Sequence, residues 1–356
     1  MKILFPIAFL GFVALLAIYI DKRLIKKLYL KSRYIKTFRI FLFLNFIGIA
    51  GYMISRYYPE IPSFLYLMLS ISIGVIFLLF CITIFYDLFS LSIKFIPLSE
   101  NRRLFFKKSL DFTALGFAGF LTGRSIWEAK HIVVENIDIK IKNLAQNFRI
   151  VQLSDIHIGG LIDEKFIKDM VMKVNVLNPD LIVITGDLID IKVKFAKKAI
   201  SALKELKSKY GTYFITGNHE FFHDIDEILA ELRLNNIKIL NNESSYVGEY
   251  GSGFNLAGVN DIFGYRMGKY MPDINMAISK CIKGSPSILL AHQPLFVEEA
   301  QNFDIDLMLS GHTHGGQLYP FRFWLNCSNR MWQDIIGIMI DYRCMSIAVP
   351  DIGGRQ

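Results

Sequence analysis

The sequence predicts an N-terminal helical membrane region followed by an α/β domain. Long apolar runs with few charges are confined to residues 1–125. From about Ile132 onwards, short β-branched runs alternate with amphipathic helical stretches, which is the pattern of an α/β domain. Five of these short runs end in Asp, Asn or His. At 356 residues, the chain has room for both parts.

Charge divides the chain in the same way. Residues 1–125 hold 16 Lys/Arg against 5 Asp/Glu, and the remaining residues hold 24 against 27. The basic balance therefore belongs to the apolar front part, and no nucleic-acid partner is expected from it. The 4 cysteines are scattered and predict neither a disulfide framework nor a CxxC metal site.

The front part, residues 1–125, predicts a membrane anchor of three to four transmembrane helices. Ile3–Ile20 is uncharged and long enough to cross the hydrocarbon core of a bilayer. A signal peptide fits this run less well, because no small-residue cleavage site follows and further apolar spans come after it. Ile40–Ile54 and Ser63–Tyr86 predict the second and third spans, and the weakly hydrophobic Phe112–Thr122 is a marginal fourth.

The basic loops predict the orientation of this anchor. Residues 21–39 and 94–108 are rich in Lys and Arg, which the positive-inside rule assigns to the cytoplasm. The domain after about Arg124 is then expected outside the cytoplasmic membrane, with membrane lipids around the multi-pass anchor. The segment Asn101–Lys107 also resembles a twin-arginine export signal. An ordinary basic flank is the alternative, and both interpretations place the same domain outside.

Residues 126–145 are expected to form a linker and a first strand, and residues 146–356 the catalytic domain. The predicted strands are 148–153, 180–184, 212–215, 287–290 and 305–309. Apolar residues at helical spacing predict a helix over 164–177, and the Lys-rich stretch 194–209 predicts another. No oligomeric state is predicted.

Each predicted strand ends in a polar cluster. Because the carboxyl ends of parallel strands meet at one edge, we expect the edge of one sheet to collect seven potential metal ligands. They are Asp155, His157, Asp187, Asn218, His292, His312 and His314. Asp155 and Asp187 are tolerable side by side only with a cation between them. Nitrogen and oxygen ligands without thiolate suit Mn, Fe, Zn or Ni, and ligand type alone does not choose among them.

In this order, D-x-H, G-D-x-x-D, G-N-H-E, a lone His and G-H-x-H resemble the calcineurin-like metallophosphoesterase family over residues 145–320. The subgroup behind a membrane or export segment is most similar. The resemblance implies an αββα sandwich with a dinuclear metal site. One metal would be bound by Asp155, His157, Asp187 and His314, and the second by Asp187, Asn218, His292 and His312. His219 would be the acid or charge stabiliser at the leaving group, and Glu220 would support the ligands.

The resemblance implies a membrane-anchored phosphoesterase with two divalent metal ions that hydrolyses a phosphodiester, phosphomonoester or pyrophosphate bond. Such ions lower the pKa of a bridging water and offset charge during in-line displacement. Because the domain is tethered to a membrane, a lipid-linked phosphate or pyrophosphate is one substrate to expect. The alternative function is a metal-dependent binding or sensor module, or an inactive truncated family member.

The C-terminal tail departs from the family pattern. The family continues past the double-histidine turn into further strands and a segment resembling GTGYWGPP, whereas the tail from Trp324 shows no strand alternation. In a shifted reading frame, the codons from Phe323 to Gln356 permit a string that ends in GTGYWGPP. We therefore expect a single-base frameshift near Phe323, which resequencing of the gene through that codon tests. All proposed ligands precede it.

Overall fold

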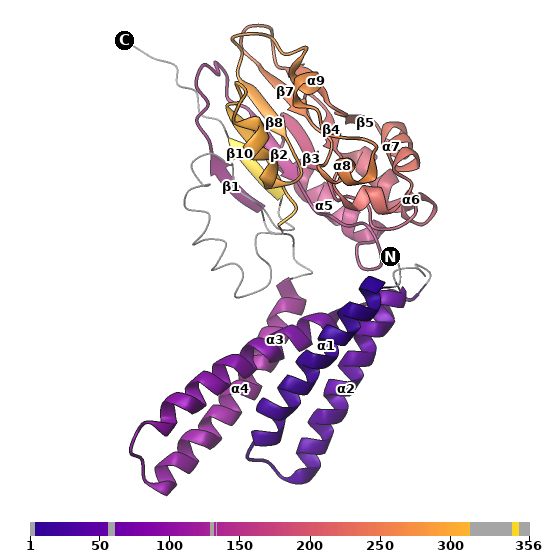
Figure 1. Cartoon of the computed structure of the whole chain (residues 1–356). Coiled ribbons are helices and arrows are strands. Elements are labelled where there is room, and N and C mark those ends of the chain that lie inside the picture. Colours follow the sequence, from indigo (N-terminus) through magenta and orange to yellow (C-terminus); the bar gives the residue numbers. More distant parts are fainter. Residues whose placement is uncertain (1–3, 56–60, 129–131, 133, 314–343, 349–356) are drawn as a thin grey trace. The chain divides into compact units, whose positions relative to one another are not determined.

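The computed structural model describes residues 4–55, 61–128, 132, 134–313 and 344–348. The chain divides into two compact units, Met1–His131 and Ile132–Gln356 (Figure 1). The first unit is helical, and the second contains two β-sheets with helices.

The first unit is built from four long helices that contain all the apolar runs of the front part. They are α1 (Leu4–Arg23), α2 (Ser32–Ser55), α3 (Ser63–Lys94) and α4 (Glu100–Glu128), with a 3-10 turn η1 (Ile25–Lys27) after α1. Among the described residues, α2 and α3 are long and apolar enough to cross a membrane. The first and the marginal fourth predicted runs lie in α1 and α4.

Apolar side chains from all four helices share one core, which includes Ile20, Ile49, Ile76 and Ala114. Helices α2 and α3 approach closely at Gly48, where an added Cβ would lie 2.2 Å from the Ser72 Oγ atom. A small residue at such a crossing lets two helix backbones come together, as is usual in helical membrane proteins.

Two aspartates of this unit collect polar partners. Asp87 in α3 accepts hydrogen bonds from Arg23 (2.6 Å), Lys27 (3.1 Å) and the Tyr19 hydroxyl (3.2 Å). The buried Asp111 in α4 accepts from the backbone N–H of Tyr29 (2.6 Å) and from the hydroxyl of Tyr86 (2.8 Å). These bonds connect α1 and the segment after it to α3 and α4, and they leave both carboxylates with partners.

The larger sheet of the second unit has six strands in the order β1-β10-β2-β3-β4-β5. Their bounds are β1 Val134–Asp138, β2 Arg149–Leu153, β3 Leu181–Thr185, β4 Thr212–Ile215, β5 Ile237–Ile239 and β10 Cys344–Ala348. Strands β2 to β5 are parallel, with Val151 opposite Ile182 and Val183 opposite Tyr213. Strand β10 pairs antiparallel to β2 and parallel to β1.

The smaller sheet has four strands in the order β6-β7-β8-β9. They are β6 Glu243–Val247, β7 Phe254–Gly258, β8 Ser287–Leu290 and β9 Leu307–Leu309. Strand β6 is antiparallel to β7, whereas β7, β8 and β9 are parallel.

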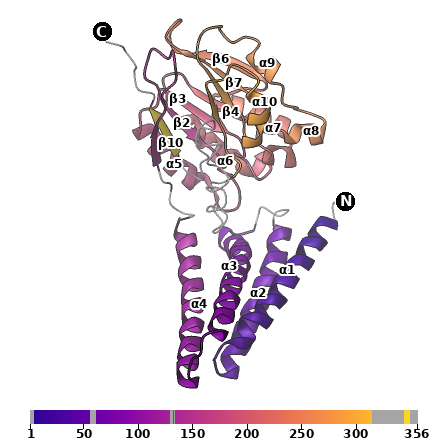
Figure 2. The same cartoon turned by 60° about the vertical axis from the view of Figure 1, so that its left-hand side comes forward.

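The helices cover the outer faces of the two sheets, which pack against each other (Figure 2). Helices α5 (Glu164–Val176), α6 (Val193–Ala202) and α7 (Ile225–Leu234) share a core with the larger sheet. Helices α9 (Ile274–Ile278) and α10 (Val297–Ala300) do so with the smaller sheet. Short turns complete the unit: α8 (Phe263–Met267), η2 (Leu203–Glu205), η3 (His219–Phe222) and η4 (Pro294–Phe296). The predicted αββα sandwich is confirmed.

Alternation along β3 explains how one strand serves two cores. Ile182 and Ile184 belong to the core with helices α5 to α7, and Leu181 and Val183 belong to the core between the sheets. Successive side chains of a strand point to opposite faces. A strand buried on both faces must therefore be apolar throughout, as this one is.

The structure corrects three predictions. The ligand-bearing strands belong to two sheets instead of one, because β8 and β9 pair with β7. The predicted helix 194–209 ends early, at Ala202, and is followed by η2. The side chain of Asn175 binds the chain there: its amide N–H donates to the carbonyl of Glu205 (2.9 Å), and its side-chain oxygen accepts from the N–H of Lys207 (2.8 Å). The tail contains a strand, β10, because pairing with β1 and β2 outweighs its weak local pattern. The expected frameshift stays a prediction.

Candidate metal centre

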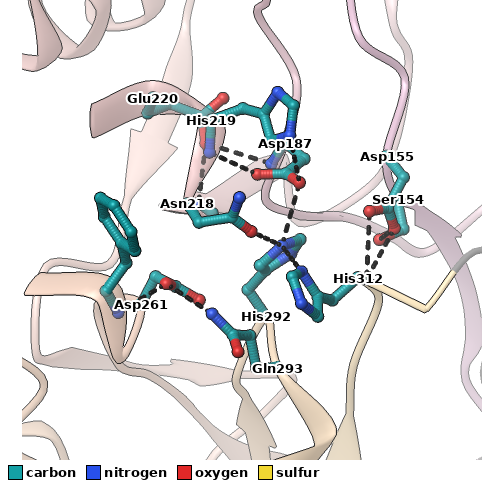
Figure 3. A network of polar contacts seen from close by, with 12 residues as sticks. Ser154, Asp155, Asp187, Asn218, His219, Glu220, Asp261, His292, Gln293 and His312 are labelled. Atoms are coloured by element: carbon teal, nitrogen blue, oxygen red, sulfur yellow. Dashed lines mark hydrogen bonds and ion pairs between the residues drawn. The ribbon is translucent and has the colours of Figure 1, made fainter. Parts of the chain in front are cut away.

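The candidate site lies where strand ends from both sheets meet (Figure 3). Asp155 and His157 follow β2, Asp187 follows β3, and Asn218 and His219 follow β4. From the smaller sheet, His292 follows β8 and His312 follows β9. The Asp187 carboxylate lies between His219 and His292. The predicted ligand His314 lies outside the described residues, so its place in the site stays a prediction.

The loops after β2 and β3 continue to pair beyond the strands. The N–H of Asp155 donates to the carbonyl of Gly186 (3.2 Å), and the N–H of His157 donates to that of Asp187 (3.0 Å). Ile158 and Ile189 then form an isolated parallel bridge. This extended pairing holds the Asp155 and Asp187 loops against each other.

Four of the predicted ligands have left-handed backbone conformations. Their φ angles are 54° at Asp155, 53° at His157, 50° at Asp187 and 71° at His312. For a residue with a Cβ atom this conformation costs about 1–2 kcal/mol. Backbone strain of this kind concentrates at functional sites, where the surrounding contacts hold it.

Two glycines allow the β3 and β4 loops to touch. At Gly186, where φ is 86°, an added Cβ would lie 2.7 Å from the Cα of Gly217 and 2.7 Å from His292 Nδ1. At Gly217, an added Cβ would lie 2.3 Å from the Asp187 carboxylate. A side chain at either position would displace a candidate ligand.

Glu220 holds these two loops together from behind the site. Its buried carboxyl group accepts hydrogen bonds from the N–H groups of Asp187 (3.1 Å), Leu188 (2.8 Å), Ile189 (3.1 Å) and Gly217 (2.7 Å). Burial and the charge of Asp187 raise the pKa of Glu220 to about 7, against the opposing effect of the backbone N–H groups. Glu220 therefore contacts both loops that carry candidate ligands, and its role in supporting bound metal stays a prediction.

Within the described part of the chain, two groups of side chains could hold a metal ion, and both contain Asp187. The first group consists of Asp187, His292 and His312, whose ligand atoms lie within 4.8 Å of one another. His292 Nε2 lies 3.2 Å from Asp187 Oδ2, 3.2 Å from Asn218 Oδ1 and 3.2 Å from His312 Nδ1. The four predicted ligands of the second metal are thus together.

The donor atoms of this group fit a cation. His292 Nδ1 lies 2.7 Å from the carbonyl oxygen of Thr185, a contact that requires a proton on Nδ1 and leaves Nε2 facing Asp187. Burial lowers the pKa of His292, but the charge of Asp187 outweighs burial and raises it to about 10. A divalent ion at Nε2 would replace any proton held there, so metal binding is expected to depend on pH.

The second group consists of His157, Asp187 and His219. His157 Nε2 and His219 Nε2 lie 4.0 and 3.8 Å from Asp187 Oδ2. The structure brings His219 into this group, whereas the resemblance assigned its place to Asp155 and His314. The Asp155 carboxylate accepts hydrogen bonds from the Ser154 hydroxyl (2.5 Å) and from the backbone N–H of His312 (2.9 Å) in the loop after β9. The ligand role of Asp155 stays a prediction.

Asp190 is a member of the site to which the sequence analysis gave no role. One of its carboxylate oxygens contacts Nδ1 of His157 (3.1 Å) and Nδ1 of His219. Burial raises the pKa of Asp190, but the hydrogen bonds with His157 and His219 outweigh burial and hold the pKa well below its usual range. Its place in G-D-x-x-D was the available signal, but spacing alone did not show that it faces two imidazoles.

Asp261 and Gln293 were also missed. The Gln293 amide donates to Asp261 Oδ1 (2.9 Å), which also accepts from the N–H of Phe263 (2.7 Å). Asp261 follows β7, a strand that the sequence analysis did not identify, so its closeness to His292 could not be predicted. These contacts join the start of α8 to the His292 loop.

Comparison with known sequences agrees with this class of fold and site. The profile of the calcineurin-like phosphoesterase family matches residues 148–316. An uncharacterized metallophosphoesterase of Campylobacter jejuni is 36% identical over 309 residues, which cover 86% of this chain and 82% of that protein. One from Helicobacter pylori is 35% identical over 286 residues, covering 79% and 75%.

The structure defines an αββα domain with two groups of side chains that could hold metal ions where the strand ends meet. The chain belongs to the calcineurin-like metallophosphoesterase family. Because 86% of the chain is more than the second unit contains, the similarity to the Campylobacter protein extends into the helical unit. A Bos taurus transmembrane protein with a metallophosphoesterase domain is 35% identical over 241 residues, covering 63% of this chain and 53% of that protein.

Glu220→Gln is expected to destabilise the second unit. All four partners of the carboxyl group are N–H donors, so the new amide group would point its own N–H towards at least one of them. Leaving such buried groups unpaired costs about 1–3 kcal/mol. The measurement is chemical unfolding, with Glu164→Gln, whose ion pair with Lys168 is exposed, as the matched control. Equal stability of the two variants would contradict the bracing role of Glu220.

Proposed function

We propose that this protein is a membrane-anchored phosphoesterase that uses two divalent metal ions to hydrolyse a phosphodiester, phosphomonoester or pyrophosphate bond outside the cytoplasmic membrane. The observation that carries the proposal is that both groups of potential ligands share the carboxylate of Asp187. A shared carboxylate is what a pair of neighbouring ions requires. When bound, two such ions neutralise phosphoryl oxygens and activate water for in-line displacement.

The protein's own groups have separable tasks in this proposal. Asp187, Asn218, His292 and His312 would hold one ion, while Asp155, His157, Asp187 and His314 would hold the other. His219 is oriented by its backbone N–H, which donates to Asp187 (2.8 Å), and by Asp190 at its Nδ1 atom. Its Nε2 atom is thereby left to carry a proton to the leaving oxygen.

Similarity to a transmembrane protein with a metallophosphoesterase domain and the apolar helices α2 and α3 support the membrane-anchored part of the proposal. We propose four membrane crossings, α1 to α4, with the basic loops on the cytoplasmic side. A lipid-linked phosphate or pyrophosphate is then within reach of the tethered domain.

Hydrolysis itself is tested with the purified protein, added Mn and an aryl phosphodiester. The wild type should release the phenol, and Asp187→Asn should lose metal and rate together, because the charge shared by both ions is gone. Metal content is measured by mass spectrometry, and Asp169→Asn, an exposed position on α5, is the control. An Asp187→Asn variant that kept its metals and full activity would rule out the bridging role.

His219→Ala separates metal binding from proton transfer. An alkoxide leaves poorly without a proton, whereas a nitrophenolate leaves readily, and general acid catalysis contributes roughly 10²- to 10⁴-fold. We expect the variant to keep its metals, to lose most activity on alkyl phosphodiesters and to lose much less on aryl ones. Because the structure also places His219 among potential ligands, metal content decides between the two roles. Loss of metal would make His219 a ligand or a structural support.

The orientation is tested with reporter fusions. Alkaline phosphatase fused after Glu128 should be active and β-galactosidase at the same place inactive, because the positive-inside rule keeps residues 21–39 and 94–108 in the cytoplasm. Fusions within residues 94–108 should show the opposite pattern. A junction after Glu128 that is active only with the cytoplasmic reporter would overturn the proposed location.

A further inference from the structure

An exposed aromatic side chain lies directly beside the proposed acid. Phe222 ends the turn η3 that begins at His219, and the two ring centroids are 5.3 Å apart in an edge-to-face arrangement. The residue is nevertheless 55% exposed. Single exposed apolar residues are ordinary on a protein surface. Phe222 differs because its ring packs on a residue that would face the leaving group.

The Phe222 ring has a second aromatic neighbour. Phe263 in α8 lies 5.4 Å from Phe222 between centroids and also contacts Phe221 (5.8 Å). The guanidinium of Arg266 lies 5.7 Å from the centroid of the Phe263 ring. Phe263 is thus partly covered by its neighbours, and Phe222 offers the exposed apolar surface of this aromatic pair.

Hydrogen bonds through Asp261 connect Phe263 to the loops of the candidate metal centre. Asp261 Oδ1 accepts from the N–H of Phe263 and from the amide of Gln293, the residue after His292. The backbone N–H of Asp261 donates to the hydroxyl of Thr216 (3.1 Å), just before the loop that carries Asn218 and His219. Phe263, and through it Phe222, is therefore held at a defined place relative to His219 and His292.

Two other ligand-bearing loops expose large apolar side chains. Leu161 follows His157 by four residues and is 42% exposed, and Leu295 follows His292 by three and is 58% exposed. A chain of three or four residues spans at most about 11–14 Å, so each Cα atom lies within that distance of the preceding ligand. Three of the loops that carry candidate site residues therefore each expose a large apolar side chain.

We propose that Phe222 determines specificity for the leaving group, and that the site takes phosphate esters of alcohols with a hydrocarbon chain. This inference rests on the proposed function. The leaving oxygen would lie at His219, so the first carbons of the alcohol reach the adjacent ring. Covering that exposed ring removes apolar area from water, and a ring already in contact with two aromatic neighbours loses little conformational freedom on binding.

The test compares leaving groups of increasing chain length. The full chain, in lipid nanodiscs with Mn, is given methyl phosphodiesters whose second alcohol is ethanol, butanol or hexanol, at concentrations where the esters are monomeric. The alcohol released is identified by chromatography, so that cleavage at the longer chain is counted. We expect kcat/KM to rise with chain length, by up to about fourfold for each added methylene that is buried.

Phe222→Ala should remove most of this rise, lowering kcat/KM for the hexyl ester about tenfold and for the ethyl ester less than twofold, since only the longer chain covers the ring. Phe222→Leu should keep much of the rise, and Leu234→Ala, 72% exposed at the end of α7, should change nothing. Metal content is measured in each variant. An equal loss on both esters with metals intact would mean that Phe222 only orients His219, which overturns the proposal.

A wild type that hydrolyses all the esters at one rate, whatever the chain length, also overturns it. Calorimetric binding of the matched alkyl phosphonates gives the same comparison without turnover. If no ester is hydrolysed but hexyl phosphonate binds more tightly than ethyl, and Phe222→Ala removes the difference, the phosphoesterase function fails and the apolar subsite stands. If neither hydrolysis nor chain-dependent binding is found, the subsite fails as well.

Discussion

The hydrogen bonds between the buried carboxyl group of Glu220 and four backbone N–H groups are the interaction on which the rest of the site depends. It accepts three N–H groups from the β3 loop and one from the β4 loop, in a place without solvent. A buried carboxyl group needs such partners, and unpaired N–H groups in the same place would be costly. The β3 and β4 loops are thereby held in one arrangement, with Gly186 against Gly217. Asp187, Asn218 and His219 take their places from that arrangement.

The carboxylates of Asp187 and Asp190 each contact more than one side chain of the site. Asp187 belongs to both groups of potential metal ligands, and Asp190 contacts one imidazole that would bind metal and one that would move a proton. Because each carboxylate is shared, substitutions at neighbouring positions will not have independent effects. In the proposed mechanism, metal binding and proton transfer would therefore be coupled through Asp187 and Asp190, which are three residues apart.

The candidate ligands come from both sheets. Strands β2 to β4 supply the carboxylates, the amide and two imidazoles, while β8 and β9 supply His292 and His312. The apolar core between the sheets, which includes Val183, Leu256 and Ile288, sets the distance between these two sets. Packing of these apolar residues thus decides whether the potential ligands of the first group can approach one another, with His292 Nε2 lying 3.2 Å from Asp187 Oδ2 and 3.2 Å from His312 Nδ1.

The sequence by itself determined the apolar helical runs, the five strands that carry candidate ligands and the polar residues that follow those strands, but it did not show β5, β6 or β7. Alternation and apolar runs depend on local periodicity, which is why β4 and β8 were predicted at 212–215 and 287–290 as observed. It could not determine that β8 and β9 form a second sheet, that β10 pairs between β1 and β2, or that Asp190 faces two imidazoles. Strand pairing joins residues that are far apart in sequence. The left-handed backbone at four candidate ligand positions and the contact of Phe222 with His219 depend on close packing. Only the tertiary structure decides them, because their free energy comes from neighbours that local pattern does not specify.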